Sequence, residues 1–135
     1  MNKRNLRLEK YGISGKRYKE LCGFCEQYPD WKRMIADFPF VKAVNYKPTP
    51  GSPNTGTSDP TAQMAIKIEQ YIHNCTLIEQ VAMEADDERW EFIIKSVCYE
   101  VPIAYLETME GMYLSKSAFY ERRRYFFYLL DKAKT

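Results

Sequence analysis

Apolar residues recur at the spacing of helices along most of the chain, and no segment shows a useful length of strand-like alternation. The first apolar segment follows Ser14, a residue type that caps helices, and runs to about Tyr28. A second helix is expected to restart at Pro29, and the pattern breaks at Phe-Pro-Phe-Val, residues 38–41. The pattern predicts an all-α protein that begins with a helical N-terminal segment over residues 1–44.

A change of composition follows this segment. Residues 45–60 read NYKPTPGSPNTGTSDP and contain four prolines and two glycines. Proline and glycine interrupt helices, so we expect a linker or a long exposed loop over residues 45–59. This is the one clear domain boundary in the sequence.

The longest apolar stripe begins after this boundary. Ser58-Asp59 provides a cap, Pro60 occupies the first turn, and the stripe continues to about Glu84. Some 25 residues span roughly 37 Å at the rise of a helix, so a helix over 60–86 would act as a scaffold or pair with a second chain. The stripe holds more apolar residues than a small core needs, which predicts a symmetric homodimer. These residues are Ile66, Ile68, Ile72, Leu77, Ile78 and Val81.

Residues 87–135 have the layout of a helix-turn-helix. The pattern predicts three helices of about 13, 9 and 16 residues, the first capped by Asp86 or Asp87 and the last by Ser115. Tyr113 stands where a minimal turn has glycine, and Gly111 comes too early, so we expect a longer turn.

The last expected helix, from Ser115 to about Asp131, has two distinct faces. At 100° per residue, Phe126 and Leu130 each fall within about 20° of Phe119, and the three form the expected core stripe. The opposite face is polar and basic near the helix N-terminus, the end that enters the major groove of DNA. The candidate DNA-binding residues on and beside that face are Lys116, Ser117, Tyr120, Glu121, Arg122, Arg123, Arg124 and Tyr128.

These side chains suit different parts of a DNA duplex. Arg124 can donate to guanine O6 and N7, and Glu121 can accept from a cytosine amino group. Arg122, Arg123 and Lys132 are placed for phosphates, which hold a helix in register without reading sequence. An ordinary amphipathic helix with solvated arginines fits the same periodicity.

Charge is segregated along the chain, although the net charge is only +2. Residues 1–20 hold seven Lys/Arg and two Glu, residues 60–110 hold three Lys/Arg and ten Asp/Glu, and residues 115–135 hold six Lys/Arg and two Asp/Glu. A basic C-terminal segment is the electrostatic footprint expected of a nucleic-acid reader, and it is also what a solvated charged surface looks like.

The C-terminal segment also contains a motif. SKSAFYERRRYFFYLLDK, residues 115–132, contains Ser-x-x-x-Phe-Tyr-x-x-Arg-Arg and resembles the recognition helix of small phage and prophage transcriptional regulators of the RinA and ArpU kind. Residues 58–68, SDPTAQMAIKI, and 11–32, YGISGKRYKELCGFCEQYPDWK, are similar to other segments of these or related phage proteins. The resemblance implies binding of double-stranded DNA near phage promoters, with RNA polymerase as a further partner. The residues it implicates are Ser117, Tyr120, Arg123 and Arg124.

Other residue types that carry chemistry are better explained as structural. Cys22 and Cys25 form a CxxC motif on a predicted helix. A redox role would need a βαβ context and a zinc site would need two further ligands, so we expect buried structural thiols and no metal. His73 has no nucleophile or carboxylate partner at a useful spacing. The acidic run at 84–91 lacks the alternating ligands of a calcium loop and suits a helix N-terminus.

Several functional classes are disfavoured by what the sequence lacks. It has no GxSxG motif and no Gly-rich phosphate loop, so we expect neither an enzyme nor a cofactor. No stretch approaches the roughly 18 apolar residues that a membrane span needs. The basic N-terminus is not followed by an apolar signal region, so we expect a cytoplasmic protein of a bacterial host cell with free cysteines.

The sequence therefore predicts a phage-derived, sequence-specific DNA-binding transcriptional regulator, with residues 87–132 as the reader. Two alternatives stay open. A small terminase subunit, which acts in DNA packaging, also joins a helix-turn-helix to oligomerising helices but forms larger rings. A phage-encoded inhibitor of a host protein, such as a defence nuclease, would instead use the acidic run at 84–91 or the aromatic N-terminal segment.

Overall fold

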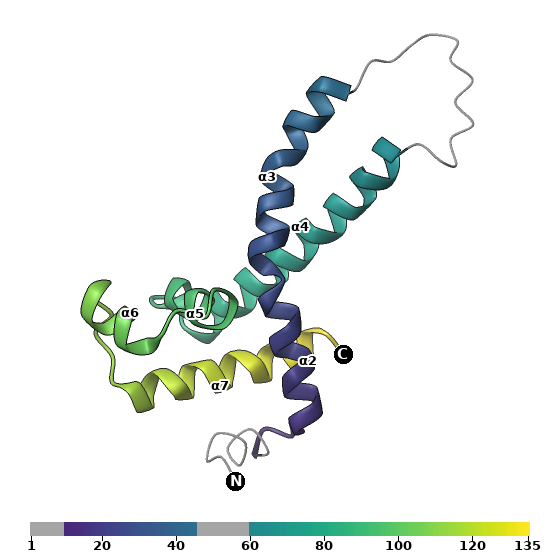
Figure 1. Ribbon diagram of the computed structural model, residues 1–135. Helices are drawn as coiled ribbons and strands as arrows, with labels where there is room; N and C mark the ends of the chain where they lie inside the picture. The colour runs from purple at the N-terminus through teal and green to yellow at the C-terminus, as the bar shows by residue number, and fades with distance from the viewer. Residues whose placement is uncertain (1–9, 46–59) are drawn as a thin grey trace, which may run out of the picture.

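Helices account for all the regular structure that can be described. The computed structural model describes residues 10–45 and 60–135, except for the side chains of 39–45 and 60. No strand occurs in these residues, which confirms the all-α prediction (Figure 1). The predicted linker at 45–59 lies, apart from Asn45, outside the described residues. The helices are α2 (Gly15–Glu26), α3 (Tyr28–Asn45), α4 (Pro60–Ala85), α5 (Trp90–Cys98), α6 (Ile103–Met109) and α7 (Lys116–Ala133).

Helices α3 and α4 form an antiparallel pair whose outer part projects from the rest of the molecule (Figure 1). We call this outer part, residues 32–45 and 60–74, the arm. At the base of the arm the ring of Trp31 stacks on that of Tyr71, with centroids 6.1 Å apart and planes 20° apart. The 26 residues of α4 correspond to roughly 39 Å, so this one helix extends from the arm into the body of the molecule.

The start of α2 agrees with the prediction, and the extent of α3 does not. Ser14 caps α2, and its side chain accepts a hydrogen bond from the backbone N–H of Arg17. Helix α3 continues through residues 38–41 to Asn45, so the predicted break at Phe-Pro-Phe-Val is wrong. Because α3 packs along α4, tertiary packing outweighs the unfavourable helix propensity of Pro39.

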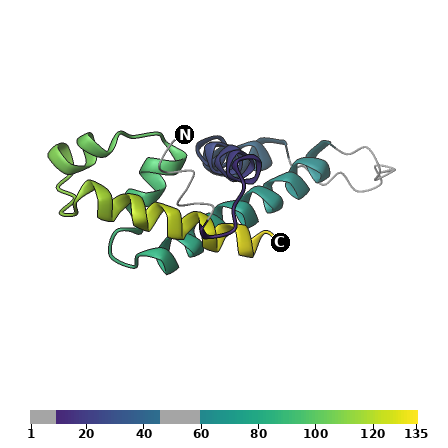
Figure 2. The ribbon, with the colours of Figure 1, turned by 90° about the horizontal axis from the view of Figure 1, so that it is seen from below.

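The body is built around the second half of α4. Cys75, Ile78 and Val81 of that half are buried and face the other helices of the body. Helix α7 lies along one side, with α5 and α6 toward its N-terminal end and α2 near its C-terminal end (Figures 1 and 2). The helices α5, α6 and α7 have 9, 7 and 18 residues, which agrees with the three helices expected after residue 87.

Two residues in the left-handed region of backbone conformation shape the connections between these helices. Glu100, with φ of 55°, follows the end of α5, and Gly111, with φ of 69°, follows α6. The connection from α6 to α7 covers residues 110–115, so the prediction of a turn longer than the minimal one is confirmed. Within it, Met112 is buried and its N–H donates to the carbonyl oxygen of Leu106 at 3.0 Å.

Among the described residues, none of the helices has the length and apolar character needed to cross a membrane.

Candidate nucleic-acid interface

The proposed reading helix, α7, begins with a well-formed cap. The hydroxyl oxygen of Ser115 accepts a hydrogen bond from the N–H of Ala118 at 3.2 Å, as the sequence predicted. The first residues of the helix, Lys116 and Ser117, are exposed. The N-terminal turn of α7 is therefore accessible to a partner.

The apolar stripe of α7 is the centre of the core. Phe119, Phe126 and Leu130 are completely buried, which confirms the core stripe read from the sequence. Phe127 is buried as well, and Tyr18 of α2 packs edge-on against it with ring centroids 5.1 Å apart. The buried arc of α7 is thus wider than the stripe expected from the sequence.

Arg124 lies inside this wider arc, so its predicted place on the exposed face is wrong. Only 5% of the residue is exposed, and its Nη2 donates to Glu121 Oε1 at 2.5 Å. The helical wheel placed Arg124 opposite the core stripe, but a wheel does not include the turn before α2. Tyr11 in that turn packs on Tyr128, with ring centroids 5.2 Å apart. Burial and the Glu121 carboxylate raise the pKa of Tyr11, as expected for a phenol beside a carboxylate.

The other candidate residues divide into an exposed and a half-buried group. Four of these residues are exposed, and all four lie in the N-terminal half of α7: Lys116, Ser117, Glu121 and Arg122. The half-buried residues are Tyr120, Arg123 and Tyr128.

Interactions within the molecule already engage several of these side chains. The guanidinium of Arg123 lies over the Tyr120 ring at 5.7 Å. Lys132, which the sequence assigned to a phosphate, lies over the Tyr128 ring at 4.7 Å. Hydrogen bonding to the Tyr128 hydroxyl raises the pKa of Lys132 above its ordinary value.

Asp86 forms an ion pair with α7 that the sequence did not predict. Its Oδ1 accepts from the N–H groups of Glu88 and Arg89 at 3.0 and 3.1 Å, so Asp86 caps the turn before α5. The N-cap of α5 itself is Arg89, which makes no side-chain cap hydrogen bond, so the prediction that Asp86 or Asp87 caps this helix is wrong. The Oδ2 of Asp86 lies 3.5 Å from Arg122 Nε and 3.6 Å from Arg89 Nη1. This buried carboxylate therefore holds Arg122 of α7 against the end of α4. Because Asp86 and Arg122 are far apart in the sequence, no local pattern predicts this ion pair.

A second ion pair attaches the N-terminal helix to α7. Arg17 Nε lies 2.6 Å from Asp131 Oδ1, and Lys134 Nζ lies 3.7 Å from the centre of the Phe24 ring. These contacts join α2 to the C-terminal end of α7. Arg17 of the N-terminal segment therefore lies beside the C-terminal end of α7, although the two are distant in sequence.

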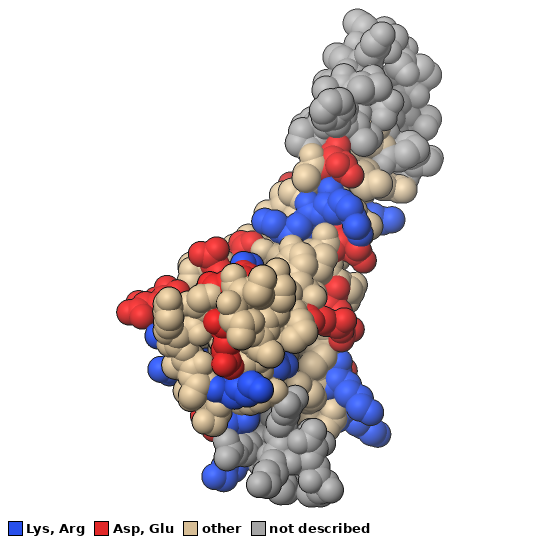
Figure 3. Space-filling view, turned by 60° about the vertical axis from the view of Figure 1, so that its left-hand side comes forward, with Lys and Arg blue, Asp and Glu red and all other residues tan. Residues whose placement is uncertain are grey.

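Acidic and basic side chains occupy different parts of the surface. On the face in Figure 3, acidic side chains border the apolar end of the body around α6, and basic side chains lie below it and on the arm. Helix α6 itself has no lysine or arginine. Electrostatics therefore disfavours α6 as a phosphate-binding element.

The cysteines do not form a metal site within the described chain. Cys25, Cys75 and Cys98 are buried and Cys22 is half-buried, and no group of three or more metal-ligating side chains occurs among the described residues. Hydrogen bonding to Cys98, followed by burial, raises the pKa of Cys25 well above its ordinary value. The thiols of Cys25 and Cys98 are packed where α2 meets α5, and Cys75 lies on α4. His73 is exposed.

Comparison with known proteins gave no relatives: no family model, no curated protein and no solved structure matches the chain.

Proposed function

We propose that this protein is a sequence-specific DNA-binding transcriptional regulator of phage origin that inserts the N-terminal half of α7 into the major groove. The observation that carries the proposal is the accessible, Ser115-capped start of α7. Phe119 and Phe126 anchor the helix in the core, while Lys116 and Ser117 are exposed beyond it. A rigid helix with a free N-terminus and exposed polar side chains has the geometry of a major-groove reader.

The assignment of roles differs from the one that the sequence suggested. Lys116 and Arg122 would contact phosphates, and Ser117 and Glu121 would contact base edges. Arg124 becomes a positioning residue, because its guanidinium is buried and holds the Glu121 carboxylate. A carboxylate fixed in this way is better prepared to accept from a cytosine amino group than a freely rotating one.

We place the expected homodimer contact on the arm. Ile68, Ile78 and Val81, which the sequence reading counted as available for a partner, are buried within the chain. Ile66 and Ile72 are 67% and 45% exposed, and Met34 and Met64 of the arm are also exposed. Packing two arms against each other would bury these side chains and place two copies of α7 on a two-fold DNA site.

The test is a binding titration on DNA that flanks the gene of this protein, with a random duplex of equal length for comparison. Lys116→Ala should weaken binding to both duplexes and lower the salt dependence by about one unit, as expected for a lost phosphate contact. Glu121→Gln should weaken the preferred duplex by about tenfold and leave the random one unchanged. Lys19→Ala is the matched control, since Lys19 is an exposed lysine on α2, outside both α7 and the arm.

Two results would overturn this proposal. Failure of the unchanged protein to prefer any flanking segment over random DNA would remove sequence-specific binding. Equal losses for Lys116→Ala and Lys19→Ala would show that binding depends on overall charge and that α7 is not the reader.

The size of the oligomer separates regulation from DNA packaging. We expect the mass of a dimer in solution, and Ile66→Glu should shift it to that of a monomer. A ring of eight or more copies would support the small terminase alternative.

A protein-binding role is the second candidate, and the end of the body around α6 favours it. Met109 and Tyr105 of α6 are 69% and 47% exposed, and Tyr113 in the turn after α6 is 89% exposed. Exposed apolar side chains bordered by acidic ones suit a basic protein surface, such as one on RNA polymerase or on another host protein. Met109→Lys should abolish such an interaction without changing DNA binding, and pull-down from host extract would measure it.

A further inference from the structure

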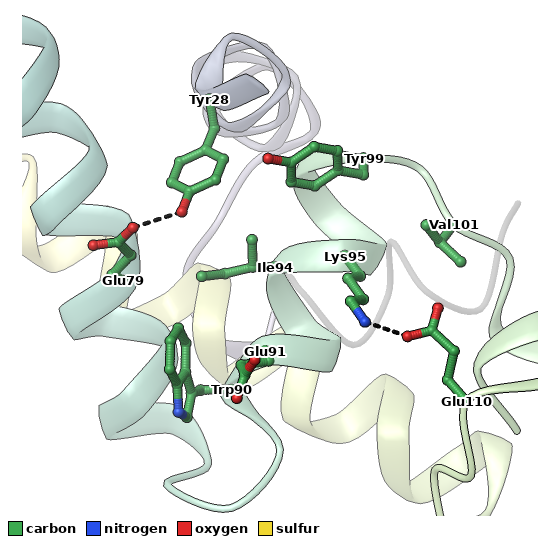
Figure 4. A pocket seen from close by; sticks show the side chains of 9 residues that line it. All are labelled: Tyr28, Glu79, Trp90, Glu91, Ile94, Lys95, Tyr99, Val101 and Glu110. Atoms are coloured by element: carbon green, nitrogen blue, oxygen red, sulfur yellow. Dashed lines mark hydrogen bonds and ion pairs between the residues drawn. The ribbon is translucent and has the colours of Figure 1, made fainter. Parts of the chain in front are cut away.

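A pocket of about 430 Å³ lies between the start of α3, the end of α4 and α5, and no residue of α7 lines it. Tyr28 of α3, Glu79 of α4 and Trp90 of α5 contribute to its walls, and Ile94 lies between the aromatic rings (Figure 4). Its volume is within the range of small-molecule sites, which begins at about 300 Å³.

Aromatic rings form two sides of this pocket. Tyr28 and Tyr99 meet edge to face, with ring centroids 6.0 Å apart, and Trp90 lies across the pocket from them (Figure 4). Tyr99 is about half exposed and Trp90 half-buried, so both rings have surface available to a ligand. Aromatic faces attract cations through the negative potential above the ring.

The charges around the rings are mainly negative. Glu79, Glu91 and Glu110 line the pocket, whereas Lys95 is its one basic lining residue. Lys95 forms an ion pair with Glu110, and that pair is neutral overall (Figure 4).

The two remaining carboxylates, those of Glu79 and Glu91, differ in whether a neighbouring group balances their negative charge. Glu79 Oε2 accepts from the Tyr28 hydroxyl at 2.5 Å and lies 3.4 Å from Lys32 Nζ. Burial, followed by the hydrogen bond to Glu79, raises the pKa of Tyr28, so the phenol stays neutral. Glu91 forms no ion pair with any described residue. The pocket therefore has, in Glu91 of the first turn of α5, an exposed carboxylate without an ion-pair partner beside open aromatic faces.

We propose that this pocket is a binding site for a small organic cation, a ligand with an ammonium or guanidinium group. The cation would lie against Trp90 and Tyr99, and Glu91 would balance its charge. The ligand could be a free amine or a basic side chain of a peptide, since both present the same cationic group. The site is independent of DNA binding by α7, because none of the candidate DNA-binding residues lines it.

The test uses the full-length protein and follows backbone amides and the Trp90 indole N–H by NMR during titration. Choline is the probe for a free cation, and 3,3-dimethylbutan-1-ol is its uncharged analogue of nearly equal shape. A capped tripeptide with a central lysine tests the peptide source. We expect saturable shifts at Trp90, Glu91 and Tyr99 with choline or with the peptide, and whichever binds more tightly identifies the source.

Matched variants separate a specific site from general attraction of cations. Glu91→Gln should weaken cation binding about fivefold, the effect of losing one partly exposed charge at contact distance. Trp90→Leu should weaken it about threefold or more through the lost ring. Glu20→Gln removes the same charge from an exposed site on α2 and should have no effect.

Three results would overturn the proposal: no saturable shift with either cation, equal binding of the uncharged analogue, or equal effects of Glu91→Gln and Glu20→Gln. Because the DNA titration does not involve this pocket, either proposal can fail without the other.

Discussion

The burial of Arg124 leads to a prediction that is the reverse of the one suggested by the sequence. A base-reading arginine would be needed for specificity and dispensable for stability. A buried arginine that pairs with Glu121 is expected to contribute to stability through its stem and to DNA binding only through the orientation of Glu121. The substitutions Arg124→Met and Arg124→Ala distinguish the two roles.

The expected loss in free energy of unfolding depends on which atoms of the Arg124 side chain each substitution keeps. Arg124→Met retains an unbranched apolar stem and removes a buried charge whose Nε has no hydrogen-bond partner. The pair with Glu121 is partly exposed, since half of the Glu121 side chain is accessible, so its loss should cost only about 0.5–1 kcal/mol. Arg124→Ala also removes two further methylene groups from the interior at about 0.8 kcal/mol each, so we expect a total of roughly 2–3 kcal/mol.

Urea unfolding followed by far-UV circular dichroism gives the free energy of unfolding, and fluorescence anisotropy gives DNA affinity. Arg124→Met should unfold within about 1 kcal/mol of the parent and lose less than about threefold in affinity for the preferred duplex. The reasoning would be refuted if Arg124→Met kept its stability but lost tenfold or more on the preferred duplex alone. That result would mean that Arg124 leaves its buried position and contacts a base.

Three further predictions concern stability. Phe119→Ala should lower the free energy of unfolding by roughly 3–5 kcal/mol, because the ring is completely buried, and a loss below 1 kcal/mol in urea would contradict the core assignment. Glu100→Gly should raise it by about 1 kcal/mol, because φ of 55° is unfavourable for a residue with a Cβ, and a lower melting temperature would show that the Glu100 side chain matters more than its backbone. Burial raises the pKa of Cys75 from 9.0 to about 11. The unfolded thiol therefore ionises first, stability should fall as pH rises from 9 through 11, and Cys75→Ala should flatten that part of a urea-midpoint profile measured against pH.

Local signals determined the helical framework. Ser14 and Ser115 cap their helices as expected because the cap interaction reaches only three residues along the chain. The spacing of Phe119, Phe126 and Leu130 predicted their burial, because residues on one side of a helix share whatever that side packs against. All of these features depend on residues within a few turns of one another, so a single sequence contains the information.

Contacts between distant segments determined two features that the sequence pattern did not predict, the extent of α3 and the pairing of Asp86. Helix α3 continues through Pro39 because α4 packs beside it, and no residue near Pro39 indicates that support. Asp86 pairs with Arg122 across the body, which a pattern of periodicity cannot predict.

Arg124 shows the same limit at the proposed interface itself. A helical wheel gives the direction of each side chain but not how many sides of the helix are covered. In this protein α7 is covered by the core on one side and by the turn around Tyr11 on another. The sequence by itself therefore determined where α7 begins and which side anchors it, whereas tertiary packing determined how much of its basic face was left for a partner.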